Sequence, residues 1–263
     1  IAYGREGAKK MMDQYQHSLE NMNNAAVEYI RGISVVKAFK QTVYSFHRLH
    51  ETIKDFHNTR KRLEQLFADA DQDEYGRVAE VQAELSYIKS VREKACSLTD
   101  LLKKGELPLR VTHNDTKINN VLFDPETKDP LTVIDLDTVM PGLVAYDFGD
   151  AVRFSANTTA EDEKDIRKVS LDLEQFKSFA EGFLSCLKGD LTPNEVSTLA
   201  LGSFCITIEL AARFLDDYLT GDKYFKTCYE GHNLVRTKAQ LALAKDMEKK
   251  LDDMQEIVYR SME

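Results

Sequence analysis

The sequence predicts a mainly α-helical protein with a small β-hairpin, which places it in the α+β class. Apolar residues recur at three- and four-residue spacing over most of the chain, as they do on the buried face of a helix. The pattern changes in the middle, where short apolar runs of strand length occupy residues 109–112, 121–123 and 131–136. Residues 124–130 between the last two runs are rich in turn-forming types, so these two runs are predicted to pair as a hairpin.

Helices are predicted on the amino-terminal side of this hairpin. Residues 1–60 read as an amphipathic helical hairpin or as one long bent helix, with Gly32 interrupting the pattern. A second helix is predicted over residues 75–96, and a separate short turn over residues 98–102 that Gly105 ends.

Helices also follow the hairpin. One is predicted to carry a phenylalanine-rich face and to end near Gly189, and the next starts at Thr192-Pro193. Residues 199–219 are almost all apolar, so this helix should lie at the centre of the core. A last helix is predicted to bury one stripe, formed by Met247, Leu251, Met254 and Val258.

Composition excludes several classes of function. The chain has 263 residues, a formal net charge of −9 and a pI of about 5.3, so a nucleic-acid partner is not expected. Strongly anionic substrates are also disfavoured unless a cation such as Mg²⁺ accompanies them. The four cysteines are widely spaced and form no Cys-x-x-Cys pair, which suits a reducing cytoplasm, and Cys205 is expected in the core. We expect no signal peptide and no membrane span.

The motif that carries chemistry is His113-Asn114-Asp115 followed by Asn120, with Asp135 after a further strand. Phosphoryl transfer from Mg·ATP to a hydroxyl group needs a carboxylate that orients the acceptor, and an amide and a carboxylate that hold the metal. An Asp and an Asn five residues apart, then Ile-Asp, are typical of a kinase catalytic loop and its metal-binding loop. An ordinary capped turn also uses Asp and Asn. The complete string at the rim of a hairpin favours phosphoryl transfer.

Roles follow for the residues of this motif. Asp115 is expected to accept the hydrogen bond and later the proton of the acceptor hydroxyl. Asn120 and Asp135 are expected to bind Mg²⁺ through oxygen atoms. Lys117 is expected to neutralise charge on the transferring phosphoryl group, and His113 to brace the loop.

Further polar residues leave alternatives open. Asp137, placed with Asp135 in a strand, would face the same side and either assist the metal or bond to backbone. Asp147 and Asp150 are interpreted as loop-bracing or helix-capping residues. Arg213 in an apolar helix needs a partner, which is either a structural carboxylate such as Glu209 or a polar ligand. His232 is interpreted as a surface or packing residue, not a base. Neither a Gly-rich phosphate loop nor a strand lysine precedes the motif.

Residues 50–263 resemble the aminoglycoside phosphotransferase and choline kinase superfamily, and within it the N-acetylhexosamine 1-kinase type. The matching segments are 109–120, 133–142, 213–219, 224–226, 232–234 and Arg236. The resemblance implies the carboxy-terminal lobe of a protein-kinase-like fold and ATP- and Mg²⁺-dependent phosphorylation of a sugar, at the anomeric hydroxyl of an N-acetylhexosamine. It implies that Asp115 is the base and contacts substrate, that Asn120 and Asp135 hold magnesium, that Lys117 and Asn120 contact the cofactor, and that Arg213 binds the sugar.

Residues 1–50 resemble a different protein, the cytoplasmic helical segment of an ABC exporter. The segment 22–39 carries this likeness, and residues 41–46 continue it. The sequence contains no Gly-x-x-x-x-Gly-Lys motif, so transport is not expected. We therefore expect two parts, residues 1–50 and residues 51–263, with the phosphate-binding amino-terminal lobe of the kinase missing.

Three hypotheses follow, and the first is an ATP-dependent sugar kinase. The second is a catalytically inactive, truncated or chimeric kinase remnant that retains sugar or metal binding. The third is a helical interaction protein that associates with itself or a partner through residues 1–50. An aminoglycoside or choline acceptor ranks lower, because no acidic cluster dedicated to a cation is present.

Overall fold

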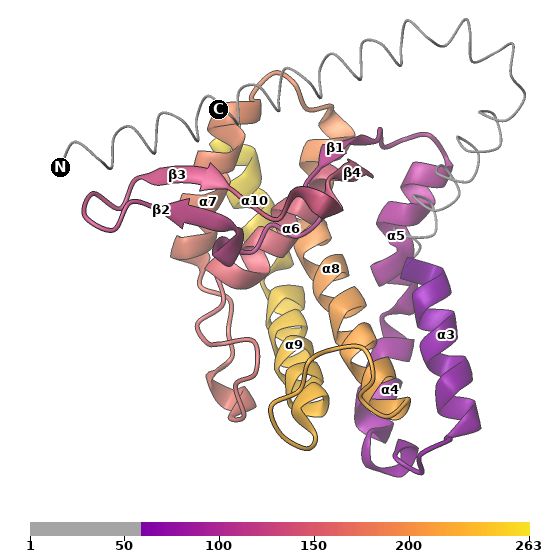
Figure 1. The fold of residues 1–263 in the computed structure, drawn as a ribbon. Coiled ribbons are helices and arrows are strands. Elements are labelled where there is room, and N and C mark those ends of the chain that lie inside the picture. Colours follow the sequence, from indigo (N-terminus) through magenta and orange to yellow (C-terminus); the bar gives the residue numbers. More distant parts are fainter. Residues whose placement is uncertain (1–58) are drawn as a thin grey trace, which may run out of the picture. The chain divides into compact units, whose positions relative to one another are not determined.

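The computed structural model describes residues 59–263, which form a helical body with short strands beside α6 (Figure 1). The predictions for residues 1–58, including the transporter-like segment, lie outside this range. The helices are α3 (Thr59–Gln72), α4 (Gln82–Ser90), α5 (Arg92–Lys103), α6 (Val144–Ser155), α7 (Leu173–Leu187), α8 (Pro193–Leu219), α9 (His232–Lys249) and α10 (Leu251–Ser261). The strands are β1 (Arg110–Thr112), β2 (Val121–Phe123), β3 (Pro130–Val133) and β4 (Met140–Gly142). Short 3₁₀ turns are η1 (Val78–Glu80), η2 (Ile118–Asn120), η3 (Leu136–Thr138) and η4 (Ile166–Lys168).

Helix α8 lies at the centre of the core, as the sequence predicts. It begins with a capping box, in which the Thr192 hydroxyl accepts from the Glu195 backbone N–H and the Glu195 carboxylate accepts from that of Thr192. Helices α3, α5, α6, α9 and α10 all pack against it. Its length and apolar composition would suit a membrane span. However, 78% of its apolar 18-residue stretch is buried within the protein, which is typical of a core helix.

Helices α6 and α8 touch through their backbones. A Cβ atom added to Gly149 of α6 would lie 2.7 Å from the backbone of Ser203, and one added to Gly202 would collide with the Ala145 carbonyl. Only glycine allows such an approach, so these two positions fix the spacing of the two helices.

The predicted hairpin is confirmed. Strand β2 pairs antiparallel with β3, and their register shifts between Leu122 and Phe123. The sequence did not predict strand β4, which pairs antiparallel with β1. The expectation that Asp135 ends a strand and shares a strand face with Asp137 is wrong. Strand β3 ends at Val133, and Asp135 precedes the turn η3 with a left-handed φ of 62°.

Two predicted helices are each divided in the structure. The helix predicted over residues 75–96 consists of η1, α4 and the start of α5, because Val91 leaves helical geometry at φ −101° and ψ 6°. The turn predicted at residues 98–102 is the second half of α5. The last predicted helix is divided at Lys250, so its apolar stripe is shared between α9 and α10.

Candidate active site

The loop after β1, which carries Asp115, is held by the buried end of α6. Asp147 accepts the backbone N–H of His113 at 2.7 Å through Oδ2 and that of Asn114 at 2.8 Å through Oδ1. The Thr116 hydroxyl donates to the Asp147 carbonyl at 2.6 Å. Burial raises the pKa of Asp147, and the two N–H donors oppose that shift. The bracing role predicted for Asp147 is confirmed.

The other side of the loop is fixed by side-chain bonds to backbone carbonyl groups. Asn114 has a left-handed φ of 63°, and its Nδ2 donates to the Thr138 carbonyl at 3.0 Å. The Thr138 hydroxyl donates to the His113 carbonyl at 2.7 Å. The His113 ring bonds the Ile134 carbonyl at 3.0 Å, so His113 braces the loop as predicted.

The structure brings Asp115, Lys117 and Asn120 together. The Lys117 ammonium lies 2.7 Å from Asp115 Oδ2, and Asn120 Nδ2 donates to the same oxygen at 2.8 Å. Asn120 also donates to the Asp115 carbonyl at 2.7 Å and is buried. Within the described range, Asp115 Oδ1 has no hydrogen bond. Asp115 therefore has one oxygen fixed and one available.

Asp135 lies near this group and beside a second acid. The carboxyl of Asp137, through a hydrogen bond and its charge, raises the pKa of Asp135, and the charge of Asp115 adds to the shift. Lys117 acts in the opposite direction. Asp115, Lys117, Asn120 and Asp135 thus form one cluster with an excess of negative charge, and Arg213 lies outside it.

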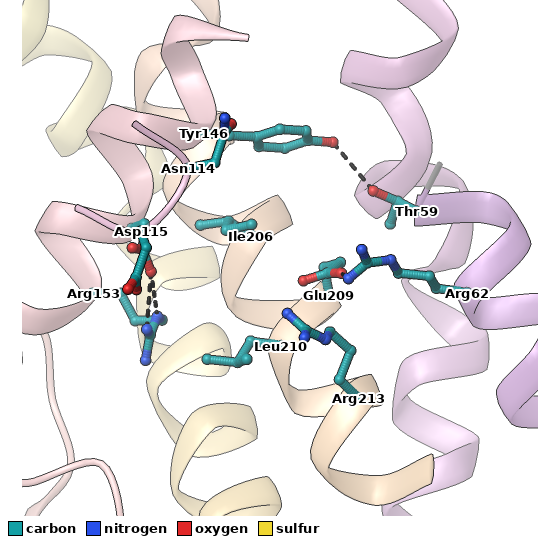
Figure 2. Close-up of a pocket in the computed structure, with 11 residues that line it drawn as sticks. Thr59, Arg62, Asn114, Asp115, Tyr146, Arg153, Ile206, Glu209, Leu210 and Arg213 are labelled. Atoms are coloured by element: carbon teal, nitrogen blue, oxygen red, sulfur yellow. Dashed lines mark hydrogen bonds and ion pairs between the residues drawn. The ribbon is translucent and has the colours of Figure 1, made fainter. Parts of the chain in front are cut away.

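A cavity of about 110 Å³ opens beside Asp115. Figure 2 shows Asp115 and Arg153 on one side of it and Thr59 and Arg62 of α3 on the opposite side. The Tyr146 and Thr59 hydroxyls bond across one edge at 3.2 Å. The remaining lining residues are Asn114, Asp150, Ile206, Glu209, Leu210 and Arg213.

The model of the Phosphotransferase enzyme family matches residues 17–176, which contain the Asp115 loop and Asp135. The chain belongs to this family. The match also covers most of the segment that resembles a transporter, and that second resemblance stays a prediction. The N-acetylhexosamine 1-kinase subtype is likewise untested.

The donor atoms in this phosphotransferase fit magnesium. Asn120 Oδ1 and the Asp135 carboxylate are hard oxygen donors, and Mg²⁺ binds through one or two carboxylates while phosphate oxygens and water complete its shell. The described range contains no group of three or more acidic, histidine or cysteine side chains placed to hold a metal. A divalent cation would nevertheless relieve the repulsion between the carboxylates of Asp135 and Asp137.

Arg213 of the phosphotransferase lies at the far side of the cavity from the Asp115 loop. It donates to the Tyr224 hydroxyl at 3.4 Å, and its guanidinium lies 5.3 Å from the Phe225 ring centroid. Glu209, considered as its structural partner, instead forms an ion pair with Arg62 of α3. Arg213 is half-buried and lines the cavity, which leaves the ligand-binding interpretation in place.

Sequence reasoning did not identify two arginines of the site. Arg153 is buried and pairs with Asp150 at 2.9 Å and Glu161 at 2.7 Å. The spacing of three residues between Asp150 and Arg153 on α6 was the sequence signal that could have predicted this ion pair. Asp150 pairs with Arg153 and does not cap a helix. Arg62 gave no local signal, because its partner Glu209 is distant in sequence. His232 packs in the body, 4.4 Å from the Tyr229 ring, as predicted.

Proposed function

We propose that this phosphotransferase transfers the terminal phosphoryl group of ATP to a sugar hydroxyl, specifically the anomeric hydroxyl of an N-acetylhexosamine. One observation carries the proposal. Asp115 lines the cavity with one carboxylate oxygen fixed by Lys117 and Asn120 and the other without a hydrogen bond in the described range. A carboxylate held in this way is suited to orient an acceptor hydroxyl.

The chemistry follows from the positions of these groups. The acceptor O–H donates to Asp115 Oδ1, and the acceptor oxygen bonds to the terminal phosphorus as the bond to the leaving ADP oxygen breaks. The proton passes to Asp115 and ADP departs. Asn120 and Asp135 are the residues that would hold magnesium, which when bound would neutralise charge on the phosphate oxygens. Lys117, whose ammonium lies beside Asp115, would contact the transferring phosphoryl group.

The sugar assignment rests on the opposite wall. Arg213 brings a hydrogen-bonding guanidinium group to the cavity, while Ile206 and Leu210 give it an apolar face. Sugar rings present both kinds of surface. The charged side chains that line the cavity largely neutralise one another, since Arg62 pairs with Glu209 and Arg153 pairs with Asp150. Such a lining suits an uncharged acceptor.

The test is to incubate the chain with Mg·ATP and N-acetylglucosamine or N-acetylgalactosamine and to look for sugar 1-phosphate by mass spectrometry. Asp115→Asn should lower turnover about 10²- to 10⁴-fold, which is the usual contribution of a positioned base. The matched control is Asp129→Asn, an exposed acid in the hairpin turn, which should retain parental turnover.

Full activity of Asp115→Asn would contradict the assignment of the base. If the parent forms no product but binds the sugar, the second hypothesis of an inactive binding module is favoured. Association that is lost on deleting residues 1–50, again without product, would favour the helical interaction protein.

A further inference from the structure

A second cavity adjoins the one beside Asp115. It has a volume of about 340 Å³, against about 110 Å³ for the first. Arg62 and Arg213 line both cavities, so the two spaces meet across these two guanidinium groups. The second is lined otherwise by Gln65, Ala212, Asp216, Asp217, Thr220, Tyr224 and Phe225.

The first cavity is smaller than the pockets that usually hold a complete small-molecule ligand. Pockets that bind small molecules usually have volumes of about 300 to 1,000 Å³. The space beside Asp115 has room for the reacting end of a ligand, and the second cavity alone reaches the lower end of that range. A ligand that fills both would pass between Arg62 and Arg213.

We infer that the acceptor is a disaccharide with a free anomeric hydroxyl, whose reducing N-acetylhexosamine ring lies at Asp115 and whose second ring occupies the second cavity. This inference rests on the proposed function. It adds a subsite whose ligand is a neutral, hydroxylated ring.

The walls of the second cavity suit such a ring. Tyr224 is 74% exposed, an unusual state for a large aromatic side chain, and Phe225 lies against it with ring centroids 4.8 Å apart. The C–H bonds on one face of a pyranose pack on aromatic rings of this kind, and the Thr220 hydroxyl and the Gln65 amide supply polar partners for ring hydroxyls.

The backbone that carries the two aromatic residues is fixed by hydrogen bonds. Asp217, buried at the end of α8, accepts the backbone N–H groups of Lys223, Tyr224 and Phe225 at 2.9, 2.8 and 2.9 Å. Asn233 of α9 donates to the same carboxylate at 2.8 Å. A carboxylate that accepts four hydrogen bonds holds its loop rigidly, and this rigidity lowers the cost of ordering when a ring stacks.

The experiment compares the binding of a monosaccharide with the binding of two disaccharides. Dissociation constants of N-acetylglucosamine, N,N′-diacetylchitobiose and N-acetyllactosamine are measured by calorimetry on the full chain, and phosphorylation of each is followed by mass spectrometry. At least one disaccharide should bind about tenfold or more tightly than the monosaccharide, which corresponds to about 1.4 kcal/mol.

A variant locates the second ring. Gln65→Trp places a large side chain at the exposed rim of the second cavity and should reduce the disaccharide-to-monosaccharide affinity ratio at least fivefold. The control is Glu64→Trp, at an exposed neighbouring position of α3 that does not line the cavity, and it should keep the parental ratio.

The outcomes separate the two proposals. A monosaccharide that is phosphorylated while both disaccharides bind equally or more weakly overturns the second subsite and leaves the proposed function standing. An unchanged ratio in Gln65→Trp also overturns it. Absence of binding and of product for all three sugars overturns the proposed function and the subsite together.

Discussion

The helical body and the strand segment of residues 110–142 are stabilised in different ways. In the body, large apolar side chains such as Phe148, Phe176 and Ile208 are completely buried. In the strand segment most of the large apolar residues are exposed, from 38% for Ile134 to 82% for Val111. The active-site loop therefore gains its order from hydrogen bonds to α6 and between β1 and β4, and little from burial. The segment that carries Asp115, Lys117 and Asn120 is attached to the core and is not part of it.

The largest expected effect tests the body. Phe148→Ala removes a fully buried ring that packs on Phe176, Phe179 and Phe183. The cavity left behind should lower the free energy of unfolding by about 3–5 kcal/mol, measured by urea denaturation. Leu131→Ser, at a 61% exposed position of β3, should change it by no more than about 0.5 kcal/mol. Equal losses for both variants would contradict the comparison.

A smaller effect on stability, with a larger one on activity, is expected at the attachment itself. Asp147→Asn replaces one accepting oxygen with a donor, so a backbone N–H of His113 or Asn114 loses its partner. The free energy of unfolding should fall by about 1–3 kcal/mol. Turnover of the sugar should fall by about tenfold or more, because the Asp115 loop loses its fixed position.

The control for Asp147 is a carboxylate with the same type of bonds elsewhere. Asp172 accepts the backbone N–H groups of Glu174 and Gln175 at the start of α7. Asp172→Asn should cost a fraction of a kcal/mol to about 1 kcal/mol and leave turnover unchanged. If it reduced turnover as much as Asp147→Asn, the loop-bracing explanation would be wrong.

The smallest expected effect is a change in stability with pH, and it arises from Asp216, which lies between α8 and α3. Burial, with the charge and hydrogen bond of Asp69 on α3, raises the pKa of Asp216 on α8 to about 7. Asp217 adds to this shift, while Arg62 and Arg213 line the same cavity. Since the pKa is raised by folding, the stabilising contribution is complete below about pH 4 and is lost as pH rises through about 7.

Asp216→Asn should remove this pH dependence. At pH 8 the variant should be more stable than the parent by about 1–2 kcal/mol, a value reduced for screening by water at this half-exposed group. At pH 4 the advantage should vanish. Urea denaturation at the two pH values measures the difference, and a pH-independent difference would contradict the raised pKa of Asp216.

Periodicity predicted the parts of the fold whose signal is local. The apolar run and the Thr-Pro start defined α8, and turn residues defined the β2–β3 hairpin. The break at Val91 and the division at Lys250 were missed, because single residues that leave helical geometry do not disturb a three-four spacing. Strand β4 was missed because Met140-Pro141-Gly142 lacks strand-forming residues, and its pairing with β1 is a long-range contact.

The candidate site shows the same division. The cluster of Asp115, Lys117 and Asn120 could be predicted, since its members lie within one short loop. The partner of Arg62 and the charges around Asp216 could not, because each joins α3 to α8 across a long stretch of sequence. Residue types predicted the phosphotransferase family, and only the packing of helices showed the shape of the cavity beside Asp115.

The glycine contact between α6 and α8 has a consequence for how acceptor preference can change. Helix α6 positions the Asp115 loop and α8 carries Arg213, so the separation of these two residues is set where two backbones touch at Gly149 and Gly202. Neither glycine has a side chain whose size could change this separation, and any larger residue at Gly149 or Gly202 would force the helices apart. Under the proposed function, variation in acceptor size therefore arises in the 220–231 loop and in α3, which makes those segments the positions to randomise when the acceptor range is to be altered.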